Sequence, residues 1–211
     1  MFTRENKLDF ENAYYSDSVN YIVGCDEAGR GPLAGPVVAS AVILSRAYIN
    51  KDINDSKQLS AKKREKLYDE IMKNAIAVGV GIVDAKTIDE INIYEASRLA
   101  MKLAIQDMNH KYDLVLTDAM PIKDLDVEVI PIIKGDAKSL CIAAASIIAK
   151  VTRDRMMDEL DKKYPMYGFK KHKGYGTKLH MDALKEFGPI EGIHRYSYKP
   201  VHDIVSFIPL F

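Results

Sequence analysis

The chain has 211 residues, of which 47% are hydrophobic and 28% are charged, and its formal net charge is zero. This length and composition predict one globular core and exclude a fibrous or disordered protein. No apolar stretch reaches the roughly 18 residues of a membrane span, and the first residues lack the apolar segment of a secretory signal. Two cysteines in predicted buried elements, Cys25 and Cys141, favour a reduced, cytoplasmic setting.

Three strands are predicted in the first half of the chain. The first, residues 21–25, is a short apolar run followed at once by two acids, Asp26 and Glu27, which we expect to reach solvent at the strand end. Residues 36–44 and 75–83, both rich in valine and isoleucine, form the second and third strands.

Helices are predicted between and after these strands. Ser60 is suited to cap a helix that runs to about residue 74 and repeats apolar residues four apart on its buried side. A longer helical region covers residues 87–108, with a break expected at residues 91–92.

The second half of the chain adds two strands and a long helix. Residues 113–117 and 127–133 are predicted strands, and the first of them lies between helices. We therefore place it inside the sheet, parallel to strand 21–25. Residues 139–164 are strongly helical, and the first part of this helix is so apolar that it must be buried on most sides.

The alternation of strands and helices predicts an α/β fold. We expect an N-terminal extension over residues 1–20, a core over residues 21–164 and an appendage over residues 165–211. One short helix, residues 177–187, is predicted in the appendage. The appendage is expected to pack on the core, so that the chain forms a single overall domain.

Four acids are predicted to meet at one edge of the sheet. Asp118 ends strand 113–117, and the carboxyl ends of parallel strands share an edge where ligands bind, so Asp118 should lie beside Asp26 and Glu27. Asp136 stands near the start of the long helix, where an anion is favoured.

These four carboxylates would carry four negative charges, and they would raise one another's pKa unless cations compensated them. Two divalent ions supply the missing charge, and hard ions such as Mg²⁺ prefer carboxylate ligands. Two ions about 3.5 to 4 Å apart suit in-line displacement at phosphorus. Any single acid could be a solvated turn residue, but together the four indicate a metal site that acts on a phosphodiester.

Short polar segments near these acids could hold the rest of a substrate. Gly29, Arg30 and Gly31 follow the acid pair, and glycines let backbone N–H groups approach a sugar or phosphate closely. Ser56 and Lys57 could hold a phosphate, although a turn before a helix explains them equally well.

Residues 162–178 are the basic part of the chain, with six lysines and no acid. Such a stretch suits a surface that binds phosphates. Tyr175 lies there between glycines and could stack on a base or sugar. A solvated basic loop and a packed tyrosine are the alternatives.

Six motifs of this chain, in this order, resemble those of the bacterial ribonuclease HII family. They cover nearly the whole chain, from about residue 21 to about residue 200. One departure is Ala119-Met120, where the family often has Gly-Asn, which could alter the turn after Asp118. The motifs are Gly24-Cys-Asp-Glu-Ala-Gly-Arg-Gly-Pro32, Asn54-Asp-Ser-Lys57, Leu116-Thr-Asp118, Lys134-Gly-Asp136, Ala145-Ser-Ile-Ile-Ala-Lys-Val-Thr-Arg-Asp154 and His172-Lys-Gly-Tyr-Gly176.

The resemblance implies an RNase H-like mixed sheet flanked by helices, with a small, mainly helical C-terminal appendage that binds substrate. It implies an endoribonuclease that cuts the RNA strand of RNA–DNA hybrids and incises 5′ to single ribonucleotides in duplex DNA, leaving 5′-phosphate and 3′-hydroxyl ends. Such an enzyme removes ribonucleotides from DNA, and we expect it to act as a monomer.

The resemblance also assigns residue roles. The four acids would bind two Mg²⁺ or Mn²⁺ ions. Gly29, Arg30 and Gly31 would recognise the 2′-hydroxyl group, which distinguishes RNA from DNA. Tyr175 would stack at the RNA–DNA junction.

Two other classes of protein remain open. A nucleic-acid-binding module without catalysis would not need all four acids. Another nuclease of the same superfold, such as a junction resolvase, would lack the glycine loop and Tyr175. Separately, the tail Ser206-Phe-Ile-Pro-Leu-Phe211 resembles the short peptides that dock bacterial proteins on the replication sliding clamp, although the usual leading glutamine is missing and a packed or disordered terminus is the alternative.

Overall fold

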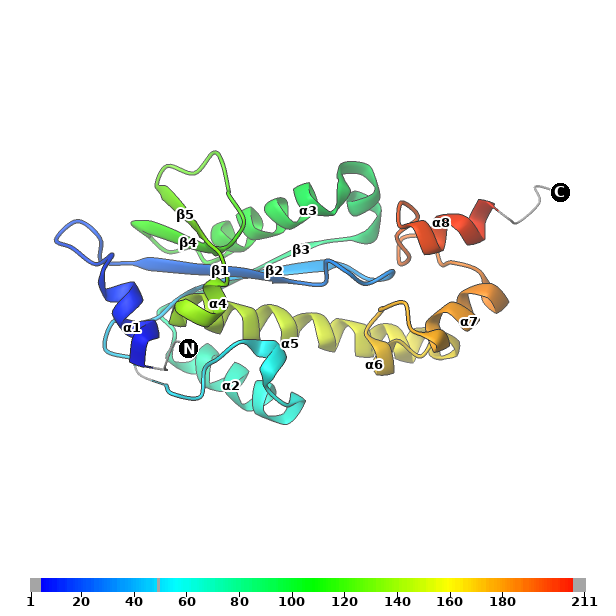
Figure 1. Ribbon diagram of the computed structural model, residues 1–211, viewed down its shortest axis with the longest axis horizontal. Coiled ribbons are helices and arrows are strands. Elements are labelled where there is room, and N and C mark those ends of the chain that lie inside the picture. The colour runs from blue at the N-terminus through cyan, green and yellow to red at the C-terminus, as the bar shows by residue number, and fades with distance from the viewer. Residues whose placement is uncertain (1–4, 49, 207–211) are drawn as a thin grey trace.

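A computed structural model describes residues 5–48 and 50–206 and has a five-stranded sheet at its centre (Figure 1). The strand order is β3-β2-β1-β4-β5. β1, β2 and β3 pair antiparallel, whereas β4 lies parallel to β1 and β5 parallel to β4, so the mixed α/β sheet is confirmed. The strands are β1 Ile22–Ala28, β2 Val37–Ile43, β3 Ala77–Val83, β4 Leu114–Asp118 and β5 Glu128–Ile132.

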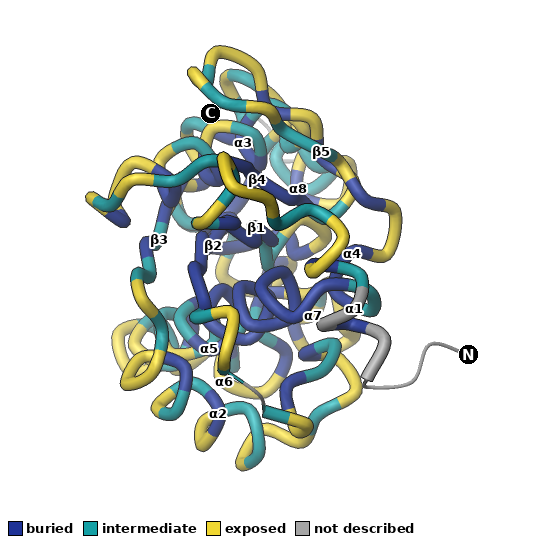
Figure 2. The backbone as a smooth tube through the Cα atoms, turned by 90° about the vertical axis from the view of Figure 1, so that its left-hand side faces the viewer, coloured by how far each residue is buried: buried dark blue, intermediate teal, exposed yellow. Residues whose placement is uncertain are grey.

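Helices cover both faces of this sheet. α3 (Ala85–Asp107) packs on one face and α5 (Leu140–Lys163) on the other, with α2 (Ala61–Asn74) packed against α5. Figure 2 shows the buried centre, which contains β1, β2 and much of α5. Cys25 in β1 and Cys141 in α5 are buried free thiols, as expected. Within the described ranges, no helix has the length and apolarity needed to cross a bilayer.

Two helix features predicted from sequence are confirmed. The Ser60 side chain accepts a hydrogen bond from an N–H group in the first turn of α2 and so caps it. Asn92 has non-helical backbone angles, φ 66° and ψ 163°, inside α3. Its side chain accepts hydrogen bonds from the N–H groups of Tyr94 and Glu95, so Asn92 acts as an internal cap from which the helix restarts.

Strand β1 is longer than predicted, and this changes the surroundings of the acid pair. β1 continues through Asp26 and Glu27, which lie opposite Ser40 and Ala39 of β2. The prediction that both acids follow the strand and reach solvent was therefore wrong, since Asp26 is only 7% exposed. The reason is that β2 extends beside them and keeps their backbone in the sheet.

The close approach of α5 to β1 depends on Gly24. A Cβ atom at this position would lie 2.1 Å from the carbonyl carbon of Cys141, which no side chain tolerates. The same approach brings the one-turn helix α4 (Gly135–Lys138), which directly precedes α5, close to the sheet. Asp136 lies in α4 rather than at the start of the long helix.

A helix before the sheet, α1 (Glu5–Asn12), was not predicted because its residues are mostly charged or polar and show no apolar face. The Nζ atom of Lys7 donates a hydrogen bond to the carbonyl oxygen of Asp136 at 2.7 Å. The Glu11 carboxylate accepts hydrogen bonds from the Ser139 hydroxyl at 2.5 Å and the Cys141 N–H at 2.7 Å. α1 therefore caps the start of α5 through Glu11 and holds the segment that carries Asp136 through Lys7.

The residues after α5 form short helices at one end of the molecule (Figure 1). The helix predicted at residues 177–187 is confirmed as α7, whereas α8 was missed. Tyr167, Phe169 and Leu184 of this part share a core with Leu33 and Ala34, which follow β1. The appendage therefore packs on the loop that continues from the acid pair. Its helices are η2 Pro165–Tyr167, α6 Phe169–His172, α7 Lys178–Phe187 and α8 Lys199–Ser206.

Candidate active site

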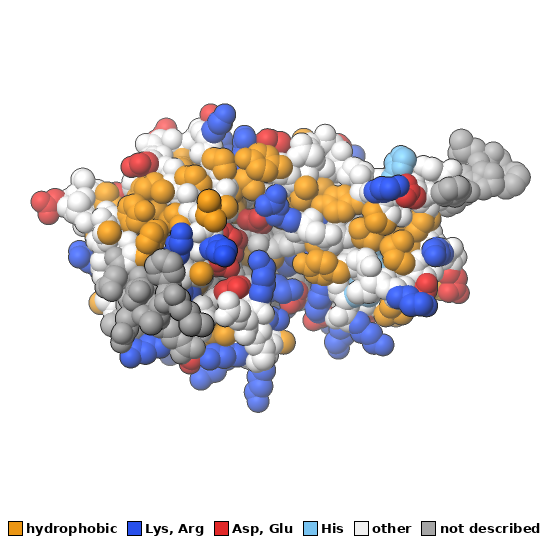
Figure 3. Space-filling view, in the orientation of Figure 1, with side chains coloured by type: hydrophobic (Ala, Val, Ile, Leu, Met, Phe, Trp, Pro, Cys, Tyr) orange, Lys and Arg blue, Asp and Glu red, His pale blue; other side chains and the backbone are white. Residues whose placement is uncertain are grey.

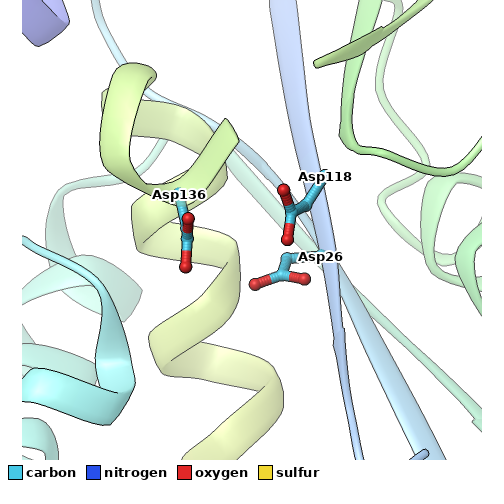
Figure 4. Close-up of side chains that lie close together, drawn as sticks. All are labelled: Asp26, Asp118 and Asp136. Carbon is cyan, nitrogen blue, oxygen red and sulfur yellow. The ribbon is translucent and has the colours of Figure 1, made fainter. Parts of the chain in front are cut away.

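Three carboxylates meet between the sheet and the start of α5 (Figure 4). Asp26 from β1, Asp118 from the end of β4 and Asp136 from α4 offer oxygen atoms that all lie within 4.8 Å of one another. β1 and β4 run parallel with Cys25 opposite Thr117, so the next residue on each strand is one of these acids. No other trio of acidic, histidine or cysteine side chains in the described ranges comes as close together.

Local hydrogen bonds hold these acids in place. Asp118 Oδ1 accepts a hydrogen bond from the Gly135 N–H at 2.8 Å, which ties the end of β4 to α4. Asp26 Oδ1 accepts one from the N–H of Glu27 at 2.7 Å. The acids are thus fixed by backbone groups, which carry no full positive charge.

The turn after Asp118 contains Ala119, one of the two residues that depart from the family motif. Ala119 has φ 55°, in the left-handed region where the family often has glycine. The Thr117 hydroxyl donates to the carbonyl oxygen of Met120 at 2.5 Å, and the Met120 side chain is buried. A left-handed alanine costs roughly 1 to 2 kcal/mol, and the Thr117 hydrogen bond and the buried Met120 side chain hold the turn in this conformation.

Glu27 stands apart from the group of three acids. Its Oε1 atom lies 3.3 Å from Nη1 of Arg30. Its Oε2 atom is buried and has no hydrogen-bond partner among the described residues. A buried carboxylate oxygen without a partner is costly, and a bound cation is one way to satisfy it.

The electrostatics of the cluster favour a cation. Burial, followed by the charges of Glu27 and Asp118, raises the pKa of Asp26 well above its usual value. Burial and the charge of Asp118 raise the pKa of Asp136, and burial raises that of Glu27 although Arg30 opposes it. Because these side chains are oxygen ligands with uncompensated negative charge, they fit divalent metal ions.

A cleft of about 340 Å³ opens beside the acids. Figure 3 shows one face of the molecule, with acidic side chains in its middle and Lys and Arg side chains beside them. A larger hollow of about 890 Å³, between α7 and α8, contains no predicted site residue. The tenth predicted site residue, Asp136, is not among the residues that line the cleft, but its carboxylate lies beside those of Asp26 and Asp118. The other nine line the cleft: Asp26, Glu27, Gly29, Arg30, Gly31, Ser56, Lys57, Asp118 and Tyr175.

Ser56 and Lys57 differ in what they offer the cleft. Ser56 is buried, and its hydroxyl oxygen accepts a hydrogen bond from the Ser146 hydroxyl at 2.7 Å. Burial lowers the pKa of Lys57, but the charges of nearby acids, first Asp26 and then Asp55, outweigh it and raise the pKa overall. Lys57 therefore places a positive charge beside the acids, and a phosphate contact by either residue stays a prediction.

Three further residues of α5 line the cleft and were given no role from sequence: Ser146, Lys150 and Arg153. They are spaced four and three residues apart, so they form one polar stripe on a largely apolar helix. This spacing of polar residues in a largely apolar helix is the sequence pattern from which the three could have been predicted to face the cleft.

The glycine loop and Tyr175 lie together in the structure. Gly29 has φ 101°, and a Cβ atom there would lie 2.1 Å from Nε of Arg153, so only glycine fits. A Cβ atom at Gly31 would lie 3.4 Å from the Tyr175 ring. Tyr175 is 47% exposed, which leaves much of its ring available for stacking.

The basic stretch carries less free charge than its sequence suggests. Lys162 pairs with Glu159 at 2.7 Å, and Lys178 pairs with Asp182 at 2.8 Å. Lys173 pairs with Asp158. Acids just outside residues 162–178 thus compensate several of the six lysines. Lys162 and Lys178 pair with acids one helix turn away, whereas Lys173, at the end of α6, pairs with an acid of α5.

The model of the Ribonuclease HII family matches residues 23–201 of this chain. The chain belongs to the ribonuclease HII family. The ribonuclease HII of Bacillus subtilis (strain 168) is 56% identical over 198 residues, which cover 94% of this chain and 77% of that protein. The ribonuclease HII of Acetivibrio thermocellus is 55% identical over 189 residues, which cover 90% of this chain and 73% of that protein.

Solved structures share the fold. The ribonuclease H2 of Pyrococcus horikoshii OT3 matches with a TM-score of 0.76 and 29% identity, covering 88% of this chain and 97% of that one. Bst-RNase HIII matches with a TM-score of 0.69 but only 19% identity, covering 92% of this chain and 71% of that one, so it supports the fold alone. Ribonuclease HII membership implies an endoribonuclease that acts on RNA–DNA hybrids and depends on divalent metal.

Two buried histidines, His180 and His194, form a hydrogen-bonded chain that ends at the backbone of Tyr175. His194 Nδ1 accepts a hydrogen bond from the Ile190 N–H at 2.8 Å, so its Nε2–H must donate to Nε2 of His180 at 3.1 Å. Nδ1–H of His180 then donates to the Tyr175 carbonyl oxygen at 3.0 Å. Both rings are neutral in this arrangement, and burial lowers the pKa of His180 to about 4 and that of His194 to about 3.

We predict that acid destabilises the fold through these histidines. In the unfolded chain a histidine has a pKa of about 6.5. Below this pH the unfolded chain binds protons that the folded chain excludes, so the free energy of unfolding falls as the pH falls towards 4. The loss should be on the order of 2 kcal/mol per histidine between pH 7 and pH 5. Urea unfolding across this range should show a shallower pH slope for His194→Gln, while the exposed His202→Gln keeps the wild-type slope. An unchanged slope in His194→Gln would show this explanation to be wrong.

Proposed function

We propose that this chain incises duplex DNA on the 5′ side of a single embedded ribonucleotide, leaving a 3′-hydroxyl and a 5′-phosphate, in addition to cutting the RNA strand of hybrids. The observation that carries the proposal is that Asp26 and Asp118, the glycine loop and Tyr175 line one cleft. Chemistry at the acids and recognition of the sugar would then occur side by side. The cellular role would be removal of ribonucleotides from DNA by a monomeric enzyme.

The acid cluster would hold two divalent ions, Mg²⁺ or Mn²⁺. Asp26, Asp118 and Asp136 supply clustered oxygens, and the unpartnered Oε2 of Glu27 supplies another. Such ions, when bound, activate water near neutral pH and stabilise the leaving oxygen of a phosphodiester. The excess negative charge of the cluster supports this assignment.

The remaining residues of the cleft would position the substrate. Lys57 brings positive charge next to the acids, where the scissile phosphate must lie. Lys150 also lines the cleft, but its ammonium group is paired with Asp154 at 2.6 Å. The glycines at positions 29 and 31 allow the backbone to approach the ribose closely. The exposed Tyr175 ring would stack on the sugar or base at the RNA–DNA junction.

Asp136→Asn should nearly abolish cutting, because it removes one ligand charge from the cluster. We expect at least a roughly hundredfold loss of rate on a DNA duplex with one ribonucleotide, and complete loss with chelator. Gel analysis of the cut strand with Mg²⁺ and with Mn²⁺ gives the rate and the position. Asp182→Asn, the same change at an exposed residue of α7 paired with Lys178, should cut like the wild type.

The same assay separates the alternative functions. A binding module without catalysis would bind the duplex and leave it intact under all metal conditions. A resolvase-like nuclease would cut an all-DNA duplex as well as the ribonucleotide-containing one. Either result would overturn the proposal.

Tyr175→Ala should weaken substrate binding, because one stacked base contributes about 1 to 3 kcal/mol. The expected rise in KM is roughly 5-fold to 100-fold, measured by steady-state cutting of the single-ribonucleotide duplex. Tyr94→Ala, which removes a similarly exposed tyrosine from α3, is the control and should leave KM unchanged. Equal effects of the two changes would argue against stacking by Tyr175.

We also propose that the tail after Ser206 docks on the replication sliding clamp. Residues 207–211 lie outside the described residues, so the support comes from a relative: a solved structure of the PCNA:RNase HII complex from Archaeoglobus fulgidus matches this chain with a TM-score of 0.68 and 27% identity, covering 87% of this chain and 96% of that one. Deletion of the last five residues should abolish binding to the bacterial clamp in a pull-down and leave cutting of free duplex intact. Retained clamp binding would refute this role.

A further inference from the structure

Two fully buried arginines have no part in the chemistry proposed above. Arg153 is 1% exposed and Arg195 0%. Buried guanidinium groups usually pair with a carboxylate, because an unpaired charge is costly to bury. Among the described residues, however, the hydrogen bonds from both side chains go to backbone carbonyl oxygens, apart from one from Arg195 to the Tyr198 hydroxyl.

Arg195 binds the carbonyl oxygens of the glycine loop. Its Nη2–H group donates to the Gly29 carbonyl oxygen at 2.6 Å, and its Nη1–H group donates to the Arg30 carbonyl oxygen at 3.0 Å. Its Nε and Nη2 atoms also donate to the Gly35 carbonyl oxygen at 3.0 and 2.8 Å. The Tyr198 hydroxyl accepts from Arg195 and donates to the same Arg30 oxygen. The carbonyl groups of residues 29 and 30 therefore both point at Arg195.

Because the peptide bond is planar, the direction of each carbonyl group held by Arg195 also fixes the direction of the next N–H group. In a trans peptide the N–H of one residue points opposite to the carbonyl of the residue before it. The N–H groups of Arg30 and Gly31 must therefore point away from Arg195. Neither group donates a hydrogen bond to any described residue, and both residues line the cleft. Two neighbouring donors are thus left for a ligand.

We propose that Arg195 is a positioning residue for ribose recognition, and this rests on the function proposed above. By holding the carbonyl groups of Gly29 and Arg30, it aims the N–H groups of Arg30 and Gly31 at the 2′-hydroxyl oxygen of the ribonucleotide. A hydroxyl oxygen accepts these hydrogen bonds, whereas the 2′ hydrogen of deoxyribose does not. A site built for a hydroxyl discriminates strongly against a substrate that lacks it, since its donors stay unpaired.

Arg153 provides a matched comparison in the same region. It is equally buried, but its hydrogen bonds go to the carbonyl oxygens of Ala34, Pro36 and Lys173. It therefore joins α5 to the end of the loop and to the segment before Tyr175. It does not hold the two carbonyl groups that set the direction of the donors.

The test measures binding selectivity in the Asp136→Asn background, which is expected not to cut. Selectivity is the dissociation constant of an all-DNA duplex divided by that of the same duplex with one ribonucleotide, from fluorescence anisotropy with Mg²⁺. Arg195→Lys should lower it at least about fivefold, the effect of one lost hydrogen bond of about 1 kcal/mol. Arg153→Lys should leave it within about twofold, although both changes are expected to lower the melting temperature.

The outcomes separate this inference from the proposed function. Unchanged selectivity in a folded Arg195→Lys protein, or an equal fall in Arg153→Lys, would overturn the positioning role. If Arg195→Lys does not fold, Tyr198→Phe decides, because it removes the second donor to the Arg30 carbonyl and one acceptor of Arg195 but leaves the guanidinium group in place. A fall in selectivity supports the role, and no change refutes it. Failure of the wild type to cut the ribonucleotide duplex would instead refute the proposed function.

Discussion

Repulsion between clustered carboxylates is the constraint on which the rest of this structure depends. Asp26, Asp118 and Asp136 approach within 4.8 Å although burial and mutual charge raise the pKa of Asp26. Such a cluster persists only if the surrounding fold holds it rigidly. The parallel pairing of β1 with β4, the contact of α5 at Gly24 and the capping of α5 by Glu11 provide that rigidity. The negative charge left over is what a divalent cation would bind.

The two buried arginines nearby do not neutralise this charge, because Arg153 and Arg195 give their hydrogen bonds to backbone carbonyl groups and the Tyr198 hydroxyl. The exposed Arg30 pairs with Glu27, which stands outside the group of three acids. A guanidinium paired with Asp26 or Asp118 would compete with a metal for the same oxygens. Instead, the arginines order the loop next to the acids, so the proposed metal site and the proposed site of sugar recognition are adjacent.

Local sequence patterns predicted most of the helices and strands, but not the full length of β1 or the presence of α1. The cap at Ser60 and the break at Asn92 were predictable because both act on their own neighbours in the chain. The extension of β1 beyond Cys25 was not, because it depends on pairing with β2. α1 has no apolar face, and it is held by Lys7 and Glu11 through contacts with residues more than a hundred positions away.

For the candidate site, local sequence patterns were enough to select the residues that we propose to carry the chemistry. Two acids next to a glycine loop, an acid at the end of a predicted strand and a tyrosine among glycines are recognisable because residue type and chain neighbours define them. In contrast, the position of Glu27 outside the group of three acids and the contact of Arg195 with the loop follow from tertiary packing alone. The Arg195 bond to Gly29 joins residues 166 positions apart. Its direction depends on how the appendage packs on the core, which no local pattern contains.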